Sequence, residues 1–277
     1  MVRGAPAASV IVRAKNKADT IEDTFRTLAR QTVPLEVIVI DSGSTDGTVE
    51  IARGCADRVV EIPAEEFSYG GTLNLGSRLA STEIHFSLSA HGTHLKQTWV
   101  EECLRHYEDP RVAAITGYGI GPDGTPLLSA YRPRLDEALS NPSWGYSNHA
   151  GSWRAAVLRE HPFREDLPAC EDKEWFWRVL AAGWHVVIDP DLVVPSHHRR
   201  AAGLKALWGR EYREGFAFAV LGRPVTDGLG DTLRGWLTDF SHDSRWPTVI
   251  RPLSPPRAVE SWAHYLGTLA ARRTMRS

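Results

Sequence analysis

The fold is decided around one stretch of the chain, Leu35-Glu36-Val37-Ile38-Val39-Ile40-Asp41-Ser42-Gly43-Ser44-Thr45-Asp46-Gly47-Thr48. Its first half is a short run of apolar, mostly β-branched residues, which predicts a buried strand. Its second half is rich in residues that form turns and helix caps, so a short helix should follow. A strand that leads through such a turn into a helix is typical of a parallel α/β sheet.

The same alternation extends outward from this stretch. Strands are predicted at residues 9–12, 59–62, 84–88, 112–116, 186–188 and 192–194, and helices at 18–28, 74–80, 99–107, 152–160 and 171–182. Residues 117–148 are rich in Gly, Pro and turn formers, which indicates loops with at most a short β excursion. We therefore predict an α/β fold with a Rossmann-like, mostly parallel sheet flanked by helices.

The character of the chain changes near residue 200. A helical stripe from Leu204 to Val220 is followed by segments interrupted by proline. The predicted domains are therefore an α/β body over residues 1–200 and a C-terminal helical extension over 201–277. Residues 211–214 on the first tail helix are either a solvated charged face or a group that closes over the acceptor of the reaction.

The composition bounds the function. The chain has 277 residues, 42% of them hydrophobic, and a formal net charge of −2. This near balance predicts no nucleic-acid partner. No apolar run approaches the ~20 residues of a transmembrane helix, so none is expected. Three widely spaced cysteines without a CxxC motif favour a reducing cytoplasmic location. A peripheral place at a membrane surface stays open.

Polar residues follow several predicted strands, where an open α/β sheet binds its ligands. These residues are Arg13, Asn16, Asp41, Ser89, His91 and His197. Together they suggest a nucleotide-sized, metal-assisted site at one edge of the sheet. Each also has a structural interpretation: Asp41 could cap the following helix, Arg13 could be a solvated charge, and a histidine at a strand end is often only solvated.

Several of these segments resemble the inverting glycosyltransferases of family two, which have the GT-A fold. Residues 37–48 resemble that family's VVDDGSTDGT segment, and residues 67–76 its glycine–asparagine segment beside the nucleotide. Residues 86–91 stand where the family has a DxD metal motif, 171–175 resemble its ED motif, and 195–198 stand at its late histidine. The nearest branch is rhamnosyltransferase-like. The resemblance covers roughly residues 8–200.

The resemblance implies transfer of a sugar from a UDP- or dTDP-activated donor to a hydroxyl acceptor, with inversion. Asp172 is expected to be the general base, because an inverting transfer needs one carboxylate to take the acceptor proton. Glu171 is adjacent, points about 100° away on a helix, and is expected to contact the donor sugar or orient the loop. The remaining residues expected to bind the nucleotide or the donor sugar are Arg13, Asn16, Asp41, Asn74, Ser89 and Asn148.

The resemblance also implies a divalent metal on the diphosphate, held by His91 and His197, or by His198 if the register shifts by one. Ser89-Ala90-His91 replaces the DxD motif, so both ligands would be imidazoles. Imidazole suits Mn²⁺ better than Mg²⁺, and Mn²⁺ is therefore the expected metal. Weak metal binding, metal-independent turnover and a His91 that only hydrogen-bonds phosphate are the alternatives.

Two tryptophans are candidate platforms for the acceptor, Trp144 in a loop and Trp175 one helical turn after Asp172. Core packing is an equal interpretation of Trp175. The expected partners are a nucleoside-diphosphate sugar and a hydroxylated small molecule, glycan or lipid-linked acceptor, and a homodimer is left open. Two other functions stay open: a catalytically degenerate scaffold, which would explain the absent DxD, and a sugar nucleotidyltransferase, which the glycine-free segment at residues 13–16 disfavours.

Overall fold

The computed structural model describes residues 5–90, 95–194, 203–226, 228–238 and 251–276. Its strands are β1 Ala8–Ala14, β2 Leu35–Asp41, β3 Arg58–Glu61, β4 Ile84–Ser89, β5 Val112–Gly117, β6 Gly151–Arg154 and β7 His185–Asp189. They form one sheet in the order β3-β2-β1-β4-β6-β5-β7. Within this sheet β6 runs antiparallel to β4 and β5, and the other neighbouring pairs are parallel.

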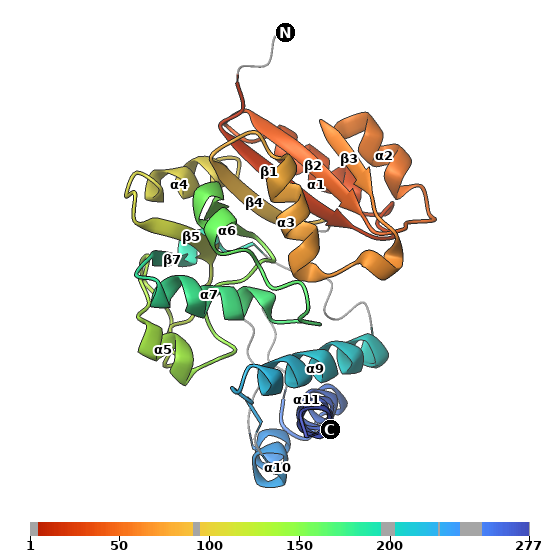
Figure 1. Cartoon of the computed structure of the whole chain (residues 1–277), viewed down its shortest axis with the longest axis vertical. Helices are drawn as coiled ribbons and strands as arrows, with labels where there is room; N and C mark the ends of the chain where they lie inside the picture. The colour runs from red at the N-terminus through yellow and green to blue at the C-terminus, as the bar shows by residue number, and fades with distance from the viewer. Residues whose placement is uncertain (1–4, 91–94, 195–202, 227, 239–250, 277) are drawn as a thin grey trace.

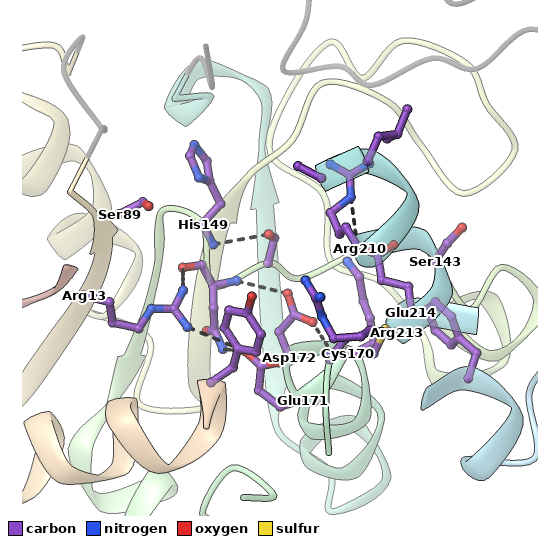
Figure 2. Close-up of a pocket in the computed structure, with 18 of the residues that line it drawn as sticks. Arg13, Ser89, Ser143, His149, Cys170, Glu171, Asp172, Arg210, Arg213 and Glu214 are labelled. Carbon is purple, nitrogen blue, oxygen red and sulfur yellow. Dashed lines mark hydrogen bonds and ion pairs between the residues drawn. The ribbon is translucent and has the colours of Figure 1, made fainter. Parts of the chain in front are cut away.

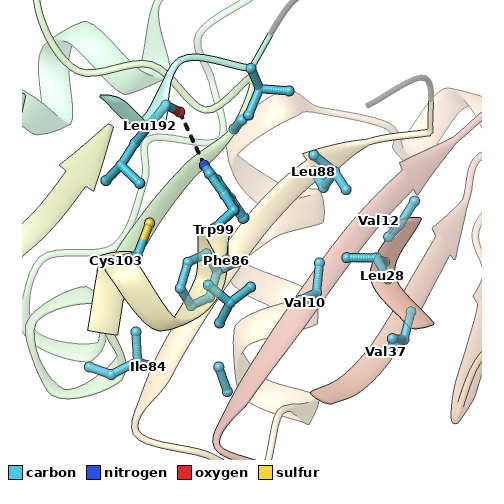
Figure 3. Close-up of a cluster of buried hydrophobic side chains, with 14 of the residues drawn as sticks. Val10, Val12, Leu28, Val37, Ile84, Phe86, Leu88, Trp99, Cys103 and Leu192 are labelled. Carbon is cyan, nitrogen blue, oxygen red and sulfur yellow. Dashed lines mark hydrogen bonds between the residues drawn. The ribbon is translucent and has the colours of Figure 1, made fainter. Parts of the chain in front are cut away.

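The helices of the α/β body are α1 Ile21–Ala29, α2 Thr48–Cys55, α3 Tyr69–Leu79, α4 Trp99–His106, α5 Leu135–Ser140, α6 Ala155–Glu160 and α7 Glu171–Ala181, with short 3₁₀ turns at Ala64–Glu66 and Pro190–Leu192. Side chains alternate across the sheet: Val10 and Val12 join a core with α1 and α4, whereas Ile11 joins a second core with α3, α6 and α7. Figure 3 shows the first core, where the Trp99 indole donates to the Leu192 carbonyl at 3.0 Å.

The mostly parallel sheet flanked by helices, predicted from the sequence, is confirmed. Three local predictions are wrong. Residues 135–140, inside the stretch predicted as loops, form helix α5, at whose start the Glu137 carboxylate accepts from the Arg134 N–H at 2.8 Å. Residues 151–154 form strand β6 instead of the start of a helix, because the sheet requires a strand between β4 and β5 and buries Trp153 completely there. Residues 192–194 are not a strand: Asp189 caps the 3₁₀ turn that begins at Pro190, and its carboxylate accepts from the Asp191 N–H at 2.9 Å.

The C-terminal extension contains α9 Gly203–Val220, α10 Leu229–Leu237 and α11 Pro255–Thr274. Helices α9 and α11 approach closely through glycines. A Cβ atom at Gly215 would lie 2.1 Å from the His264 carbonyl oxygen, and one at Gly267 would lie 2.0 Å from that of Tyr212. Phe218 of α9 packs beside Trp177 of α7, so the extension is tied to the α/β body (Figure 1).

Among the helices of the described segments, none is both long enough and apolar enough to span a lipid bilayer.

Candidate active site

The register of the sheet brings the predicted strand-end residues to one edge. Arg13 near the end of β1 pairs with Ser89 at the end of β4, and Ala14 pairs with Asp41 at the end of β2. Because β6 is antiparallel, the segment before it reaches the same edge. Its His149 carbonyl accepts from the Ser89 N–H at 3.4 Å. Arg13, Asp41, Ser89 and the loop before β6 are therefore neighbours.

A cavity of about 440 Å³ opens at this edge. The residues that line it include Arg13, Tyr69, Ser89, Asn148, Glu171, Asp172, Lys173, Arg210, Arg213 and Glu214. Figure 2 shows Arg13 on one side, the α9 residues on the other, and the two acidic residues of α7 between them. A volume of this size falls within the range of small-ligand pockets.

The first residues of α7 supply the two carboxylates. Cys170 precedes them with a left-handed backbone, φ 62°, which is uncommon for a residue with a side chain. This turn starts the helix directly at Glu171 and Asp172. Both charges therefore lie in the first turn, where the helix dipole stabilises negative charge.

Asp172 is held by the backbone on both sides. Its Oδ2 accepts from the Asn148 N–H at 3.2 Å, and its Oδ1 accepts from the Lys173 N–H at 2.8 Å. The Lys173 ammonium donates to the Tyr146 carbonyl at 2.7 Å, which ties α7 to the loop before β6. The carboxylate is thus fixed in orientation while it lines the cavity.

Glu171 is more deeply buried than its neighbour. Burial raises the pKa of Glu171 to about 7, and the adjacent charge of Asp172 acts in the same direction. The Arg13 guanidinium, 3.9 Å away, and the Asn148 amide, which donates at 3.2 Å, oppose this rise. Glu171 can therefore gain or lose a proton near neutral pH, in contact with a cation.

Arg13 and Asn148 carry two buried polar atoms without a hydrogen-bond partner among the described residues, Arg13 Nη1 and Asn148 Oδ1. Other groups of both side chains are engaged. Arg13 Nη2 donates to the Asn148 carbonyl at 3.4 Å, its guanidinium lies 5.5 Å from the centre of the Tyr69 ring, and Asn148 Nδ2 donates to Glu171. Buried polar groups are nearly always paired in proteins, so such orphans mark a place for a ligand or water.

The loops after β1 and β2 are closed on themselves. Asp41 is 1% exposed, and its Oδ2 accepts from the N–H groups of Gly43 and Ser44 at 3.0 and 2.8 Å. Asn16 Oδ1 accepts from the Thr45 N–H at 2.9 Å. Neither Asp41 nor Asn16 is among the residues that line the cavity. Asp41 does not cap α2, whose N-cap position is Gly47; its carboxylate closes the turn at Gly43 and Ser44 instead. Its expected contact with a nucleoside stays a prediction.

Asn74 lies elsewhere. It is buried in α3, accepts from the Phe163 N–H at 3.1 Å, and donates to the Phe163 carbonyl and to Glu165 at 2.9 Å each. It borders a second cavity, which also includes Ser77 and His85, rather than the one that holds the carboxylates. The structure therefore does not bring Asn74 together with Arg13 and Glu171, and its contacts position the segment before α7.

The expectation that Trp144 and Trp175 form acceptor platforms needs correction. Trp175 is 0% exposed, and its indole donates to the His161 carbonyl. Trp144 is 4% exposed, donates to the Ile120 carbonyl at 2.7 Å, and packs beside Phe176. Neither ring borders the cavity. Core packing, the alternative stated for Trp175, applies to both residues.

The predicted metal ligands His91 and His197, and the alternative His198, lie outside the described residues. Among the residues that the structure does describe, no group of three His, Cys, Asp or Glu side chains could hold a metal ion. Ser89, which replaces the first Asp of the family motif, lines the cavity. The metal site at His91 and His197 therefore stays a prediction from the sequence.

Sequence reasoning missed part of the α9 contribution. Arg210, which the sequence did not single out, lines the cavity together with Arg213 and Glu214, which it left open as a solvated face or a closure over the acceptor. Arg210 forms ion pairs with Glu211 and Glu214. Although burial opposes the charge of Glu211, its contacts with His264 and Arg210 lower its pKa to about 2. The sequence feature that could have identified Arg210 is the charged run at residues 210–214, which interrupts the apolar stripe of residues 204–220.

Comparisons with known proteins agree with this arrangement. Residues 9–167 match the family described as Glycosyl transferase family 2. The chain is 25% identical to the O-antigen chain rhamnosyltransferase RfbN of Salmonella typhimurium over 207 residues, 69% of this chain and 66% of RfbN. It is 33% identical to the O-antigen chain rhamnosyltransferase WbaN of Salmonella anatum over 116 residues, 40% of this chain and 36% of WbaN. The matched region thus spans about two thirds of the length of RfbN and about one third of the length of WbaN.

Two solved structures show the same fold. The mannosyltransferase PcManGT of Pyrobaculum calidifontis, in complex with GDP-Man and Mn²⁺, aligns with a TM-score of 0.63 and 20% identity over 99% of this chain and 74% of its own. Glucosyl-3-phosphoglycerate synthase of Mycobacterium tuberculosis, with Mn²⁺, UDP and glucosyl-3-phosphoglycerate, aligns with a TM-score of 0.55 and 19% identity over 86% and 85%. With a family match over more than half of its length, this chain belongs to glycosyl transferase family 2.

Proposed function

We propose that the protein transfers a sugar from a nucleoside-diphosphate donor to a hydroxyl acceptor, with inversion at the anomeric carbon. The observation that carries the proposal is Asp172, a carboxylate fixed by two backbone N–H groups on the wall of the 440 Å³ cavity. A general base must be held in place and within reach of its substrate, and this geometry supplies both conditions.

In the proposed reaction, the acceptor oxygen attacks the anomeric carbon from the side opposite the nucleoside diphosphate. The new bond joins that oxygen to the anomeric carbon, and the bond between this carbon and the diphosphate oxygen breaks. Asp172 takes the acceptor proton and later releases it to water. The N-terminus of α7 stabilises the ionised base before the transfer.

The donor sugar is proposed to lie against Arg13, Asn148 and Glu171, with Ser89 beside the diphosphate. UDP and dTDP sugars are the proposed donors, as the resemblance in the sequence implies, and a structural neighbour solved with UDP supports UDP as one of them. Asp41, Asn16 and Asn74 shape the surrounding loops through their described contacts. Their direct contact with the nucleotide is retained only as the expectation from the sequence.

A divalent metal, Mn²⁺ before Mg²⁺, is proposed to bind His91 and His197. Such an ion would neutralise the charge that develops on the diphosphate. Two structural neighbours were solved with Mn²⁺, which supports a metal in this fold but does not decide between the two ions.

The acceptor is proposed to enter beside α9, which forms the wall opposite Arg13. We propose that residues 1–200 form the catalytic domain and residues 201–277 a C-terminal helical extension. Helix α9 of the extension supplies part of the cavity wall. The cytoplasmic or peripheral location and the homodimer remain expectations from the sequence.

The experiment is a thermal-shift panel of UDP, dTDP, GDP, CDP and ADP, each with EDTA, Mg²⁺ or Mn²⁺, followed by turnover of the matching sugar nucleotides. Ligand at about 100 times its dissociation constant should stabilise the fold by roughly 2.7 kcal/mol. Stabilisation by UDP or dTDP together with turnover supports the proposal, and a larger effect with Mn²⁺ supports the metal. Binding without turnover of any donor would favour the degenerate scaffold.

A further inference from the structure

Two orphaned atoms of opposite hydrogen-bonding character lie around Glu171. Arg13 Nη1 is a donor and Asn148 Oδ1 is an acceptor, and neither has a hydrogen-bond partner among the described residues. Arg13 Nη1 lies 3.9 Å from Glu171 Oε1, and the amide nitrogen of Asn148 donates to the same oxygen at 3.2 Å. Both side chains line the cavity and converge on one carboxylate oxygen.

The two side chains have little freedom to satisfy these atoms by themselves. Asn148 is 2% exposed, and its amide nitrogen and both backbone polar groups are bonded to Glu171, Asp172, Arg13 or Ser87. Arg13 is held by Tyr69 and by the Asn148 carbonyl. An unmatched buried donor or acceptor loses its hydrogen bonds to water without replacing them, so a bound group that pairs with both atoms would recover that cost.

Only some chemical groups match one donor and one acceptor at the same time. A phosphate oxygen or a sugar ring oxygen accepts from Arg13 but has no hydrogen to give to Asn148. A hydroxyl accepts from the guanidinium through a lone pair and donates its hydrogen to the amide oxygen. A water molecule has the same capacity, and a ligand hydroxyl would replace it without loss.

We propose that Arg13 and Asn148 form a hydroxyl-selective subsite that recognises one ring hydroxyl of the donor sugar. This inference rests on the proposed glycosyl transfer and adds a specificity to it. The subsite distinguishes a sugar with a hydroxyl at one position from the same sugar deoxygenated there. A site built to hydrogen-bond a hydroxyl rejects the deoxy analogue strongly, because the buried partners are then left unpaired. Arg13 and Asn148 are specificity-determining residues here, and Asp172 keeps the role of base.

The test combines deletion of the ligand hydroxyl with deletion of its protein partner. UDP-glucose and dTDP-glucose are first compared for hydrolysis and transfer by the full chain. The better donor is then compared with its 2-, 3-, 4- and 6-deoxy analogues in the wild type, Asn148→Ala and Arg13→Lys. Arg53→Lys serves as a matched control, because Arg53 forms an exposed ion pair with Glu61 remote from the cavity. Unfolding midpoints verify that each variant is folded.

In the wild type, one deoxy analogue should lose about 100-fold in kcat/KM, and the other three much less. In Asn148→Ala and Arg13→Lys, the parent donor should lose activity, and the preference over that one analogue should shrink to within about 3-fold. Arg53→Lys should keep the full preference. A preference that survives in both variants, or four analogues treated alike by the wild type, would overturn the subsite while transfer itself stands. If neither glucose donor is turned over, the same comparison is made with the sugar nucleotide that the donor panel identifies, and nucleotide binding without turnover of any donor would overturn the proposed function and this inference with it.

Discussion

Two polar regions at the same edge of the sheet differ in how completely they satisfy themselves. In the loops after β1 and β2, Asp41 accepts from two backbone N–H groups and the Ser44 hydroxyl, and Asn16 ties the two loops together. In the cluster of Arg13, Asn148 and the α7 acids, two buried atoms have no described hydrogen-bond partner, and the carboxyl group of Glu171 has a pKa of about 7. We call the first region closed, because its polar groups bond to one another and keep the loops in one conformation. We call the second region open, because its unpaired buried groups can bind a ligand.

The largest effect is expected at the open region. Asp172→Asn should reduce transfer by about 10²-fold or more, because the amide cannot take the acceptor proton. Nucleotide affinity should stay within about twofold, since Asn keeps the shape of Asp and the lost charge is the one proposed to act on the acceptor rather than on the nucleotide. Steady-state kinetics with nucleotide titration measure both quantities. Asp166→Asn, at an exposed ion pair, is the control. Near-normal transfer by Asp172→Asn would show that another group is the base.

The closed region should respond in stability rather than in turnover. Asp41→Ala leaves the N–H groups of Gly43 and Ser44 without their acceptor, which should cost about 2 kcal/mol of unfolding free energy. Urea unfolding measures this loss, and Asp231→Ala, at an exposed pair with Arg234, should change little. If Asp41→Ala kept its stability and lost nucleotide binding, the contrast between the closed and the open region would be wrong. The role expected for Asp41 from the sequence, a contact with the nucleotide, would then be favoured.

Glu171 links the open region to pH. Its folded pKa of about 7 lies above its ordinary value of 4.5, so the folded state binds the proton more tightly than the unfolded state. Proton binding by Glu171 therefore contributes to the free energy of unfolding. This contribution is fully present below pH 4.5 and is lost as the pH rises through about 7. Between pH 5 and 8 the wild type should therefore lose about 2 kcal/mol relative to Glu171→Gln. Parallel stability curves for the two proteins over this range would contradict the buried, proton-binding carboxyl.

The smallest effect is expected on α9. Arg213 lines the cavity from the extension, and Arg213→Ala should raise the acceptor KM by roughly threefold to fivefold, the effect of one partly solvated charge. The donor KM and kcat should stay nearly constant. Arg223→Ala, at an exposed arginine after α9, is the control. A change in donor KM alone would place the donor, rather than the acceptor, beside α9.

The sequence predicted the sheet well, because buried parallel strands have a local signature of apolar, β-branched runs. It failed at β6, where Trp153 is placed by its neighbours in the sheet rather than by its own periodicity. It failed again after β7, where the Asp189–Pro190 cap outweighs the apolar residues that follow.

The candidate site was predictable only in part. Adjacent acids at the start of a helix are visible in a sequence, as is a polar residue after a strand, and the structure brings Arg13, Ser89, Asn148, Glu171 and Asp172 to one cavity. Burial is a property of the whole fold, so the sequence could not separate the core role of Trp144 and Trp175 from a binding role. For the same reason it did not find Arg210, whose place depends on how α9 packs.

The glycine contacts between α9 and α11 have a consequence for the order of events during synthesis. Gly215 lies against His264 and Gly267 against Tyr212, so α9 gains its support from residues made about fifty positions later. The strands and α7 can assemble while the chain is still growing on the ribosome, as N-terminal segments generally do. Phe218 can meet Trp177 before that, but the contacts of α9 with α11 form only after residue 267 has emerged. The nascent protein therefore passes through an interval in which its carboxylates exist but its substrate chamber is still open.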